Sequence, residues 1–180
     1  ASSDIAFPKK LSLYFSILNM LTRQLINVPV HLGLEHYPNI YCGVAVFLLY
    51  PLYVMDKDIN LCEKIGKSVL LLVFLTAFNL NIPNFIWHGF HYPNSLPCRQ
   101  SFIYIFFLLT MCYEALSHIK QMTSRQLGIA VWISLGLLVL IEQVFAVDET
   151  YDFKAIYLSG AFILVYAGLM IVYNLSLIHI

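Results

Sequence analysis

The sequence predicts an all-α, polytopic membrane helix bundle, and three observations support that prediction. Of the 180 residues, 60% are hydrophobic and only 11% are charged, whereas about 25% of the residues of a typical soluble domain are charged. Stretches without Asp, Glu, Lys or Arg cover residues 36–55, 68–98 and 155–180. A membrane helix needs about 20 mainly apolar residues. The apolar runs are continuous rather than alternating, so they indicate helices rather than strands.

Five membrane spans are expected to form a transmembrane helical bundle over residues 39–180. They lie near residues 39–55, 68–84, 102–117, 128–146 and 155–175. Pro51 falls inside the first span, where its missing backbone N–H predicts a kink. The aromatic content of 15% suits a protein that is anchored at two water–lipid interfaces.

Residues 1–38 are expected to form an outward-facing segment with an interfacial amphipathic helix. In KKLSLYFSILNMLTRQLIN, polar residues recur every three or four positions and would form one stripe on a helix. These residues are Ser12, Ser16, Asn19, Arg23 and Asn27. Only 12 uncharged residues separate Lys10 from Arg23, which is too few to cross a bilayer. The alternative is a bundle helix that lines a polar cavity.

The basic residues of the loops predict the orientation. The loops 56–67 and 118–127 fall on one side when the spans are counted, and they hold five Lys or Arg residues. The other side holds two, Arg99 and Lys154, when the N-terminal segment is left out. Because cytoplasmic loops carry the excess of Lys and Arg, both loops are expected in the cytoplasm. The segment before Ile40 and the connections 85–101 and 147–154 are then extracytoplasmic.

The polar candidates for function gather in the outward connection FIWHGFHYPNSLPCRQS at residues 85–101. Arg99 is its only Lys or Arg, and a guanidinium binds phosphate through two parallel hydrogen bonds. Arg99 is therefore a candidate ligand of a lipid phosphate. The alternative is an interfacial arginine that anchors a helix or pairs with Asp148 or Glu149. The other candidates for binding a lipid phosphate or a sugar are Trp87, His88, His91 and Asn94.

His88 and His91 lie three positions apart, and hydrogen bonds to a sugar or phosphate compete with plain structural hydrogen bonds as their role. A zinc site with Glu35 or His36 would require helical spacing, and the Gly and Pro residues of the loop argue against it. No metal is therefore predicted. Trp87 also fits the aromatic belt of a membrane interface.

Three acidic residues are candidate contributors to chemistry. Glu142 lies near the outer end of the fourth span. A charged residue inside a span is a functional candidate. The alternative is that the Glu142 carboxylate simply extends to the water at the membrane surface. Asp148 and Glu149 follow in the next connection. No Gly-rich phosphate loop or other cofactor motif occurs. The zero net charge gives no electrostatic basis for binding nucleic acid.

Three segments of the chain resemble the YfhO family of bacterial polytopic membrane proteins. They are PNIYCG at residues 38–43, FIWHGFHYPNSLPCRQSF at 85–102 and TMCYEAL at 110–116, of which the second is the most specific. The resemblance extends over most of the chain. Because the chain starts without Met and ends directly after an apolar run, it is expected to be an internal portion of a longer protein.

The resemblance implies a glycosyltransferase of the GT-C type in the bacterial cell membrane. Such enzymes take a sugar from a polyprenyl-phosphate carrier and attach it to a cell-envelope acceptor, such as teichoic acid, on the extracytoplasmic face. Their catalytic acid usually lies in a first outward loop that has no match here, so the catalytic residue is unknown. Arg99 would stabilise the departing phosphate, assisted by His88 or His91.

Two other classes of function remain open. A transporter or flippase of cell-envelope lipids or polysaccharide could use the same outward loops, and a non-catalytic scaffold for envelope assembly is a third interpretation. Transporters place polar residues and broken helices near the middle of the membrane. The sequence has few polar residues at that depth, which favours the enzyme.

Overall fold

The computed structural model describes residues 7–30, 37–91, 98–146 and 152–175, and these are helical without a β-sheet, which confirms the all-α class. The helices are α1 (Ile17–Thr22), α2 (Val46–Met55), α3 (Leu61–Asn79), α4 (Asn81–Trp87), α5 (Ser101–Ser117), α6 (Ser124–Phe145) and α7 (Lys154–Leu175). A 3-10 turn, η1 (Ile119–Gln121), follows α5.

Helices α6 and α7 are long and apolar enough to cross a membrane. Each has 22 residues, and a rise of about 1.5 Å per residue gives a length of roughly 33 Å. That length matches the hydrocarbon core of a bilayer, which is about 30 Å thick. A capping box formed by Thr123 and Gln126 starts α6. The fourth and fifth expected spans therefore have suitable helices in the structure.

The other three expected spans do not form helices that meet this criterion. Residues 39–45 are not helical, and α2 has only ten residues, about 15 Å in length. Helix α3 begins at Leu61 rather than near residue 68, so its first turns contain charged residues, and it stops at Asn79. Helix α5 has 17 residues. The described residues thus give two candidate spans, and the expected bundle of about five spans is not confirmed.

The amphipathic helix of the N-terminal segment is shorter than expected. Helix α1 has six residues and begins at Ile17, after the N-cap Ser16, whose side chain accepts a hydrogen bond from the backbone N–H of Asn19. The helix ends at Thr22, and Asn27 has a left-handed backbone with φ 58°. Arg23 is not on an exposed polar stripe, because only 4% of it is exposed. The burial of Thr22 and Arg23 matches a segment packed among other helices, and the interfacial position stays a prediction.

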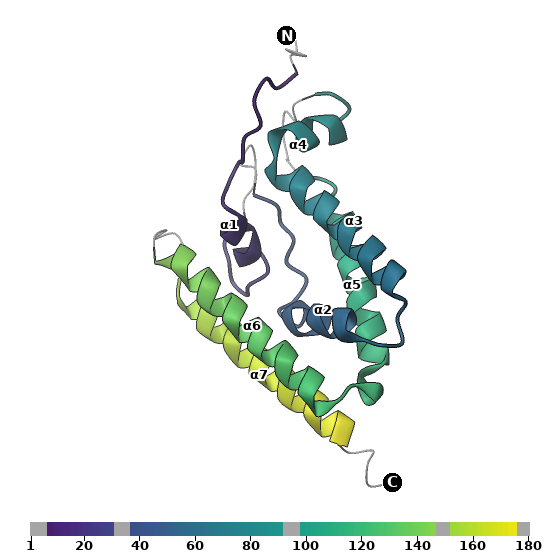
Figure 1. Cartoon of the computed structure of the whole chain (residues 1–180). Helices are drawn as coiled ribbons and strands as arrows, with labels where there is room; N and C mark the ends of the chain where they lie inside the picture. The colour runs from purple at the N-terminus through teal and green to yellow at the C-terminus, as the bar shows by residue number, and fades with distance from the viewer. Residues whose placement is uncertain (1–6, 31–36, 92–97, 147–151, 176–180) are drawn as a thin grey trace.

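The helices form two pairs that diverge from one end of the molecule (Figure 1). Helix α3 packs on α5, and α6 packs on α7. Helix α2 lies at the narrow end, where it contacts both α5 and α6. The Ser134 hydroxyl of α6 donates to the Phe47 carbonyl of α2 at 2.8 Å. The largest fully buried side chains include Tyr53, Phe78, Leu52, Met111 and Ile141, so the core includes residues from α2, α3, α5 and α6.

Polar contacts join the two loops at the narrow end. His118 Nδ1 lies 2.7 Å from Asp56 Oδ2, and the Gln126 side chain donates to the Met55 carbonyl at 2.8 Å. Asn174 of α7 donates to the carbonyls of η1 and the following turn. The loops around residues 56–60 and 118–123 therefore lie at the same end of the molecule, as counting the spans predicts.

Candidate functional site

The wide end of the molecule is built where the N-terminal segment docks on the break between α3 and α4. The Asn81 side chain donates to the Lys10 carbonyl and accepts from the Ser12 N–H, both at 2.9 Å. The Tyr14 N–H donates to the Asn79 carbonyl at 2.9 Å. In a continuous helix that carbonyl would bond to the N–H four residues on, where Pro83 has none. The N-terminal segment therefore uses an acceptor that the sequence of α4 leaves free.

Aromatic side chains pack the same junction. The rings of Phe7 and Phe85 meet edge to face with centroids 5.7 Å apart, and Phe85 meets Phe90 at 6.1 Å. Trp87 packs against Phe74 of α3 at 5.3 Å while 44% of it stays exposed. The predicted site residue Trp87 therefore has one buried face and one face toward the surroundings.

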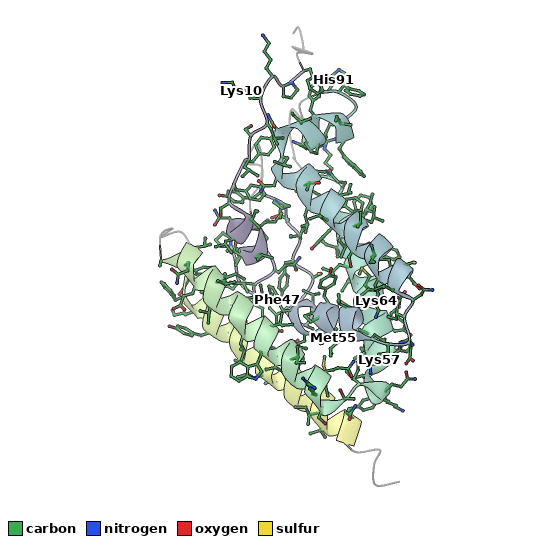
Figure 2. The ribbon with its side chains drawn as sticks, in the orientation of Figure 1. Lys10, Phe47, Met55, Lys57, Lys64 and His91 are labelled. Atoms are coloured by element: carbon green, nitrogen blue, oxygen red, sulfur yellow. The ribbon has the colours of Figure 1, made fainter. Side chains whose placement is uncertain are left out.

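We call the surface formed by residues 7–15, 80–91 and 98–101 the cationic cap. These ranges contain Lys9, Lys10 and Arg99, together with His88 and His91, and they contain no Asp or Glu. Figure 2 shows the labelled Lys10 and His91 at this end of the molecule. All three Lys and Arg residues are exposed. The cap thus contains three exposed Lys or Arg side chains and no Asp or Glu within its own ranges.

Arg99 belongs to this cap because of the turn that precedes α5. The thiol of Cys98 in that turn is buried and contacts the Phe78 carbonyl near the end of α3, with Sγ 3.8 Å from the oxygen. This contact holds the turn against the end of α3 that carries α4. The basic residues of the N-terminal segment and Arg99, far apart in sequence, are therefore brought to one end.

The two histidines are held by backbone carbonyls. His88 Nδ1 lies 2.8 Å from the Asn84 carbonyl, and His91 Nδ1 lies 3.0 Å from that of Gly89. A carbonyl oxygen only accepts, so each Nδ1 donates, and in the neutral ring Nε2 is then an acceptor. His88 Nε2 is buried and has no hydrogen-bond partner, whereas His91 is exposed.

The remaining predicted site residues are not brought to the cap within the described structure. Asn94, Asp148 and Glu149 lie outside the described residues, as do Glu35 and His36. Glu142 is partly buried in the last turns of α6, which belongs to the other helix pair and ends away from α4 (Figure 1). A role for these acidic residues stays a prediction.

Arg23, which the periodicity of the sequence placed on the polar stripe of an N-terminal helix, is buried just after α1. Its Nη2 donates to the Pro29 carbonyl at 2.6 Å and to Asn39 Oδ1 at 3.3 Å, and its Nε donates to the Pro38 carbonyl at 3.3 Å. Its Nη1 is buried without a hydrogen-bond partner. No carboxylate of the described residues forms an ion pair with it. The guanidinium is therefore held by two backbone carbonyls and one amide oxygen.

The narrow end contains a cluster with the composition of a metal site. Among the described residues, Asp56, Asp58 and His118 offer ligand atoms within 4.8 Å of one another. The Asp56 carboxylate already accepts from the Asp58 N–H and contacts the His118 ring, and the Lys64 ammonium donates to the Asp56 carbonyl. These contacts fix the loop between α2 and α3, and we assign the cluster no metal.

Comparison with known families agrees with the sequence segments. The model of the family described as bacterial membrane protein YfhO matches residues 5–180. The chain belongs to the YfhO family. This match covers the cap, the buried Arg23 and both candidate spans. No curated protein and no solved structure gives a significant match.

Membership in the YfhO family supports a bacterial membrane protein associated with the lipid bilayer. Within this YfhO-family chain, the cationic cap gathers Lys9, Lys10 and Arg99 without an Asp or Glu in the same ranges. Exposed Lys and Arg residues bind phosphate groups through charge-assisted hydrogen bonds. The residues of the cap include no carboxylate that could act as a base.

Proposed function

We propose that the chain forms part of a membrane glycosyltransferase that moves a sugar from a polyprenyl-phosphate carrier to a cell-envelope acceptor, such as teichoic acid, on the extracytoplasmic face. The observation that supports this function is the cationic cap, with Lys9, Lys10 and Arg99 exposed at one end and no carboxylate among them. In sugar transfer the bond between the anomeric carbon and the phosphate oxygen breaks, and negative charge develops on the leaving phosphate. Fixed cations stabilise that charge in the transition state.

The residues of the cap have different roles in binding the lipid-linked sugar. Arg99 offers the planar fork that pairs with two phosphate oxygens, and Lys9 and Lys10 act as point charges. The exposed face of Trp87 stacks on the sugar ring or lies at the level of the lipid headgroups. A carboxylate must take the proton of the acceptor hydroxyl as the new glycosidic bond forms. Because the cap has none, that base comes from Glu142, Asp148, Glu149 or another part of the protein.

A transporter or flippase of envelope lipids is the second candidate, and the break between α3 and α4 favours it, since transporters use broken helices. In transporters the backbone groups freed at such a break bind the substrate. Here the Asn79 carbonyl and the Asn81 N–H pair with Tyr14 and Ser12 of the N-terminal segment. The break therefore anchors a segment of the chain, and we prefer the enzyme.

The binding role is tested with vesicles that contain polyprenyl phosphate, using the chain reconstituted in a bilayer. The variant Lys9→Gln/Lys10→Gln/Arg99→Gln removes the three charges of the cap. At about 1 kcal/mol for each basic residue near an anionic surface, binding is expected to fall roughly 100-fold. The matched control Lys57→Gln/Lys120→Gln/Arg125→Gln removes three exposed charges near the narrow end and should bind as the wild type.

Three outcomes contradict the proposal. Vesicles with polyprenol, which lacks the phosphate, could bind equally well, or the control variant could lose as much binding as the cap variant. In the bacterium, the cap variant could also keep normal envelope glycosylation at normal protein levels. Lipid transport lost in the cap variant while purified enzyme still transfers the sugar would favour the transporter.

A further inference from the structure

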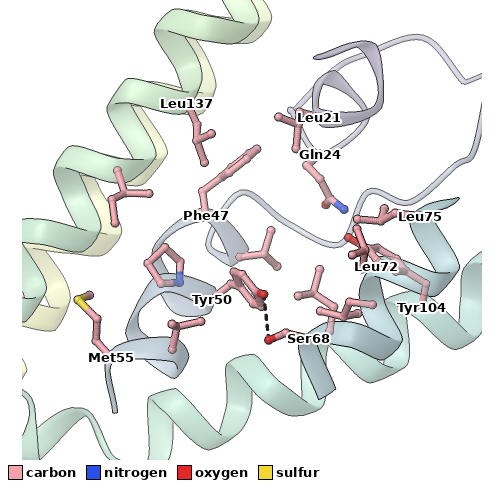
Figure 3. Close-up of a pocket in the computed structure, with 16 residues that line it drawn as sticks. Leu21, Gln24, Phe47, Tyr50, Met55, Ser68, Leu72, Leu75, Tyr104 and Leu137 are labelled. Carbon is pink, nitrogen blue, oxygen red and sulfur yellow. Dashed lines mark hydrogen bonds between the residues drawn. The ribbon is translucent and has the colours of Figure 1, made fainter. Parts of the chain in front are cut away.

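Two apolar grooves lie on opposite faces of α2, and they differ in their polar groups. The first, of about 490 Å³, lies between α2, α3 and α6 (Figure 3). Its Tyr50 and Ser68 hydroxyls bond to each other at 3.1 Å. The Gln24 side chain bonds to Tyr104 of the same lining. Because these polar groups are paired with each other and no charged residue is among the described residues of the lining, we assign this groove no ligand.

The second groove has a volume of about 520 Å³ and lies between α2, the end of α5, η1 and α7. Ala45 and Leu49 line it beside α2, and Tyr166, Leu169 and Tyr173 line it from α7. Its volume falls in the range of small-molecule pockets, about 300–1,000 Å³. The groove is therefore large enough to hold part of a lipid.

The open side of this groove is apolar. Leu116, Leu169 and Tyr173 line it and are 45%, 61% and 51% exposed. Leu169 and Tyr173 belong to α7, which is long and apolar enough to cross a membrane. The exposed apolar side chains of a membrane-spanning helix face hydrocarbon, so the groove opens to the interior of the bilayer rather than to water.

The groove extends along one leaflet of the bilayer. Tyr173 is the penultimate residue of the candidate span Lys154–Asn174, and Tyr166 lies near the middle of that span. The distance between them along the helix is roughly 10 Å at about 1.5 Å per residue, and the hydrocarbon of one leaflet is about 15 Å thick. Tyrosines are enriched at membrane interfaces. The groove therefore runs from the interface toward the middle of the bilayer, which is the course of one acyl chain.

A lysine lies at the interfacial end of the groove. Lys120 is exposed in η1, and its Nζ lies 5.4 Å from the centre of the Tyr173 ring, which is a cation–π contact. Within the described part of the chain no carboxylate forms an ion pair with Lys120, whereas Lys67 pairs with Glu63 and Glu114. The Lys120 ammonium is therefore available to an anion at the depth of the lipid headgroups.

We propose that this groove binds one acyl chain of an anionic glycerolipid and that the Lys120 ammonium pairs with the phosphate of its headgroup. A headgroup without an amine leaves its phosphate free to pair with the lysine. A chain confined to one leaflet fits a fatty acyl chain rather than a polyprenyl tail, which is longer. The site lies at the opposite end from the cationic cap and takes no part in the binding of polyprenyl phosphate there, so it does not rest on the sugar-transfer proposal.

The test uses two photoreactive lipids in bilayers that contain the complete protein. One is phosphatidylglycerol with a diazirine on an acyl chain, and the other is phosphatidylcholine with the same chain. The phosphatidylglycerol probe is expected to crosslink to the groove about fivefold more, which is the preference that one basic residue near an anionic headgroup provides. Mass spectrometry of the peptides that contain Leu116 and Leu169 measures the crosslinking.

Two variants, each with a matched control, make the result specific. Lys120→Gln should reduce crosslinking of phosphatidylglycerol to the level of phosphatidylcholine. Lys57→Gln, which removes another exposed lysine of the narrow end outside the groove, should keep the preference. Leu169→Trp fills the groove and should reduce crosslinking of both probes at least about tenfold. Leu164→Trp, on the exposed surface of α7 outside the groove, should leave both unchanged.

Three outcomes would overturn the proposal. Equal crosslinking of the two probes to the wild type would show that Lys120 selects no headgroup. Stronger capture of a diazirine polyprenyl phosphate at the same peptides would assign the groove to the carrier's tail. If no probe crosslinks there in protein with a wild-type melting temperature, another segment of the complete protein covers the groove.

Discussion

Arg23 organises the turn that follows α1. Its guanidinium donates hydrogen bonds to two proline carbonyls and to the Asn39 amide oxygen. One side chain therefore holds together two stretches of chain that lack regular structure. The Tyr37 ring lies 5.8 Å from the guanidinium carbon and adds a cation–π contact. The sequence identified Arg23 as polar but could not indicate its burial, because its acceptors are two backbone carbonyls and one side-chain amide oxygen that lie up to 16 positions away.

Replacing Arg23 should therefore destabilise the fold rather than only alter its surface. Arg23→Leu leaves three acceptors without their donor, and hydrogen bonds to charged groups are worth about 1.5–3 kcal/mol each. We expect a loss of at least about 2 kcal/mol, measured as a lower unfolding temperature in detergent. Arg23→Lys should recover only part of it, because an ammonium lacks the planar fork. An unchanged melting temperature for Arg23→Leu would contradict the observed contacts.

The cysteines allow a test of burial at single residues. Burial raises the pKa of the Cys98 thiol to about 12 from 9.0, which lowers its thiolate fraction at neutral pH about a thousandfold. Cys62 is exposed near the start of α3. Because the thiolate is the reactive form, maleimide should modify Cys62 within minutes and leave Cys98 unmodified. Mass spectrometry of the intact protein checks this, with Cys62→Ser as the control that should remain unlabelled.

Among the elements, the break between α3 and α4 differs most from the continuous span expected at residues 68–84. Asn79, Asn81, Pro83 and Asn84 interrupt the apolar run at the break, but the pattern of apolar residues does not show which segment pairs with the backbone groups that the break frees. The break depends on Pro83, on Asn81 and on a partner about 70 positions away, since Asn81 bonds to Ser12 and Lys10. The N-terminal segment is not one amphipathic helix for the same reason, because the N–H groups of Ser12, Tyr14 and Phe15 bond to Asn79 and Asn81.

Asn81→Ala should release the N-terminal segment from α4. Two side-chain hydrogen bonds to the N-terminal segment are lost, and each is worth about 0.5–1.5 kcal/mol. Trypsin should then cleave after Lys9 and Lys10 several-fold faster than in the wild type, as measured by gel electrophoresis over time. Asn60→Ala is the matched control, because it removes the cap of α3 at the opposite end. Equal cleavage of both variants at these lysines would exclude the proposed docking.

For the molecule as a whole, the sequence correctly indicated which loops lie at the same end. It gave only a weak basis for predicting which end faces the cytoplasm. The structure places the basic residues of the N-terminal segment at the wide end, with Arg99. The wide half holds Lys9, Lys10, Arg23, Arg99 and Lys154, and the narrow half holds Lys57, Lys64, Lys67, Lys120 and Arg125. Each half therefore holds five Lys or Arg residues. The excess of Lys and Arg that predicted a cytoplasmic narrow end is no longer present.

Orientation is therefore best determined by labelling. In a Cys62→Ser background, Lys10→Cys lies in the cationic cap and Lys120→Cys lies in the loop after α5. If the cap is extracytoplasmic, a membrane-impermeant maleimide added to intact cells should label Lys10→Cys and spare Lys120→Cys, and broken cells should allow both to be labelled. The reverse pattern in intact cells would place the cap in the cytoplasm and remove the basis for an extracytoplasmic reaction.

The N-terminal segment forms hydrogen bonds with both helix pairs and therefore links them. The Phe15 N–H donates to the Asn79 side chain of α3, and the Ile26 N–H donates to the Ser159 hydroxyl of α7, each at 3.1 Å. Ten residues lie between these two anchoring hydrogen bonds. The length of that segment limits the distance between the two helix pairs. Inserting or deleting one residue there would change that spacing without altering any residue of the four long helices.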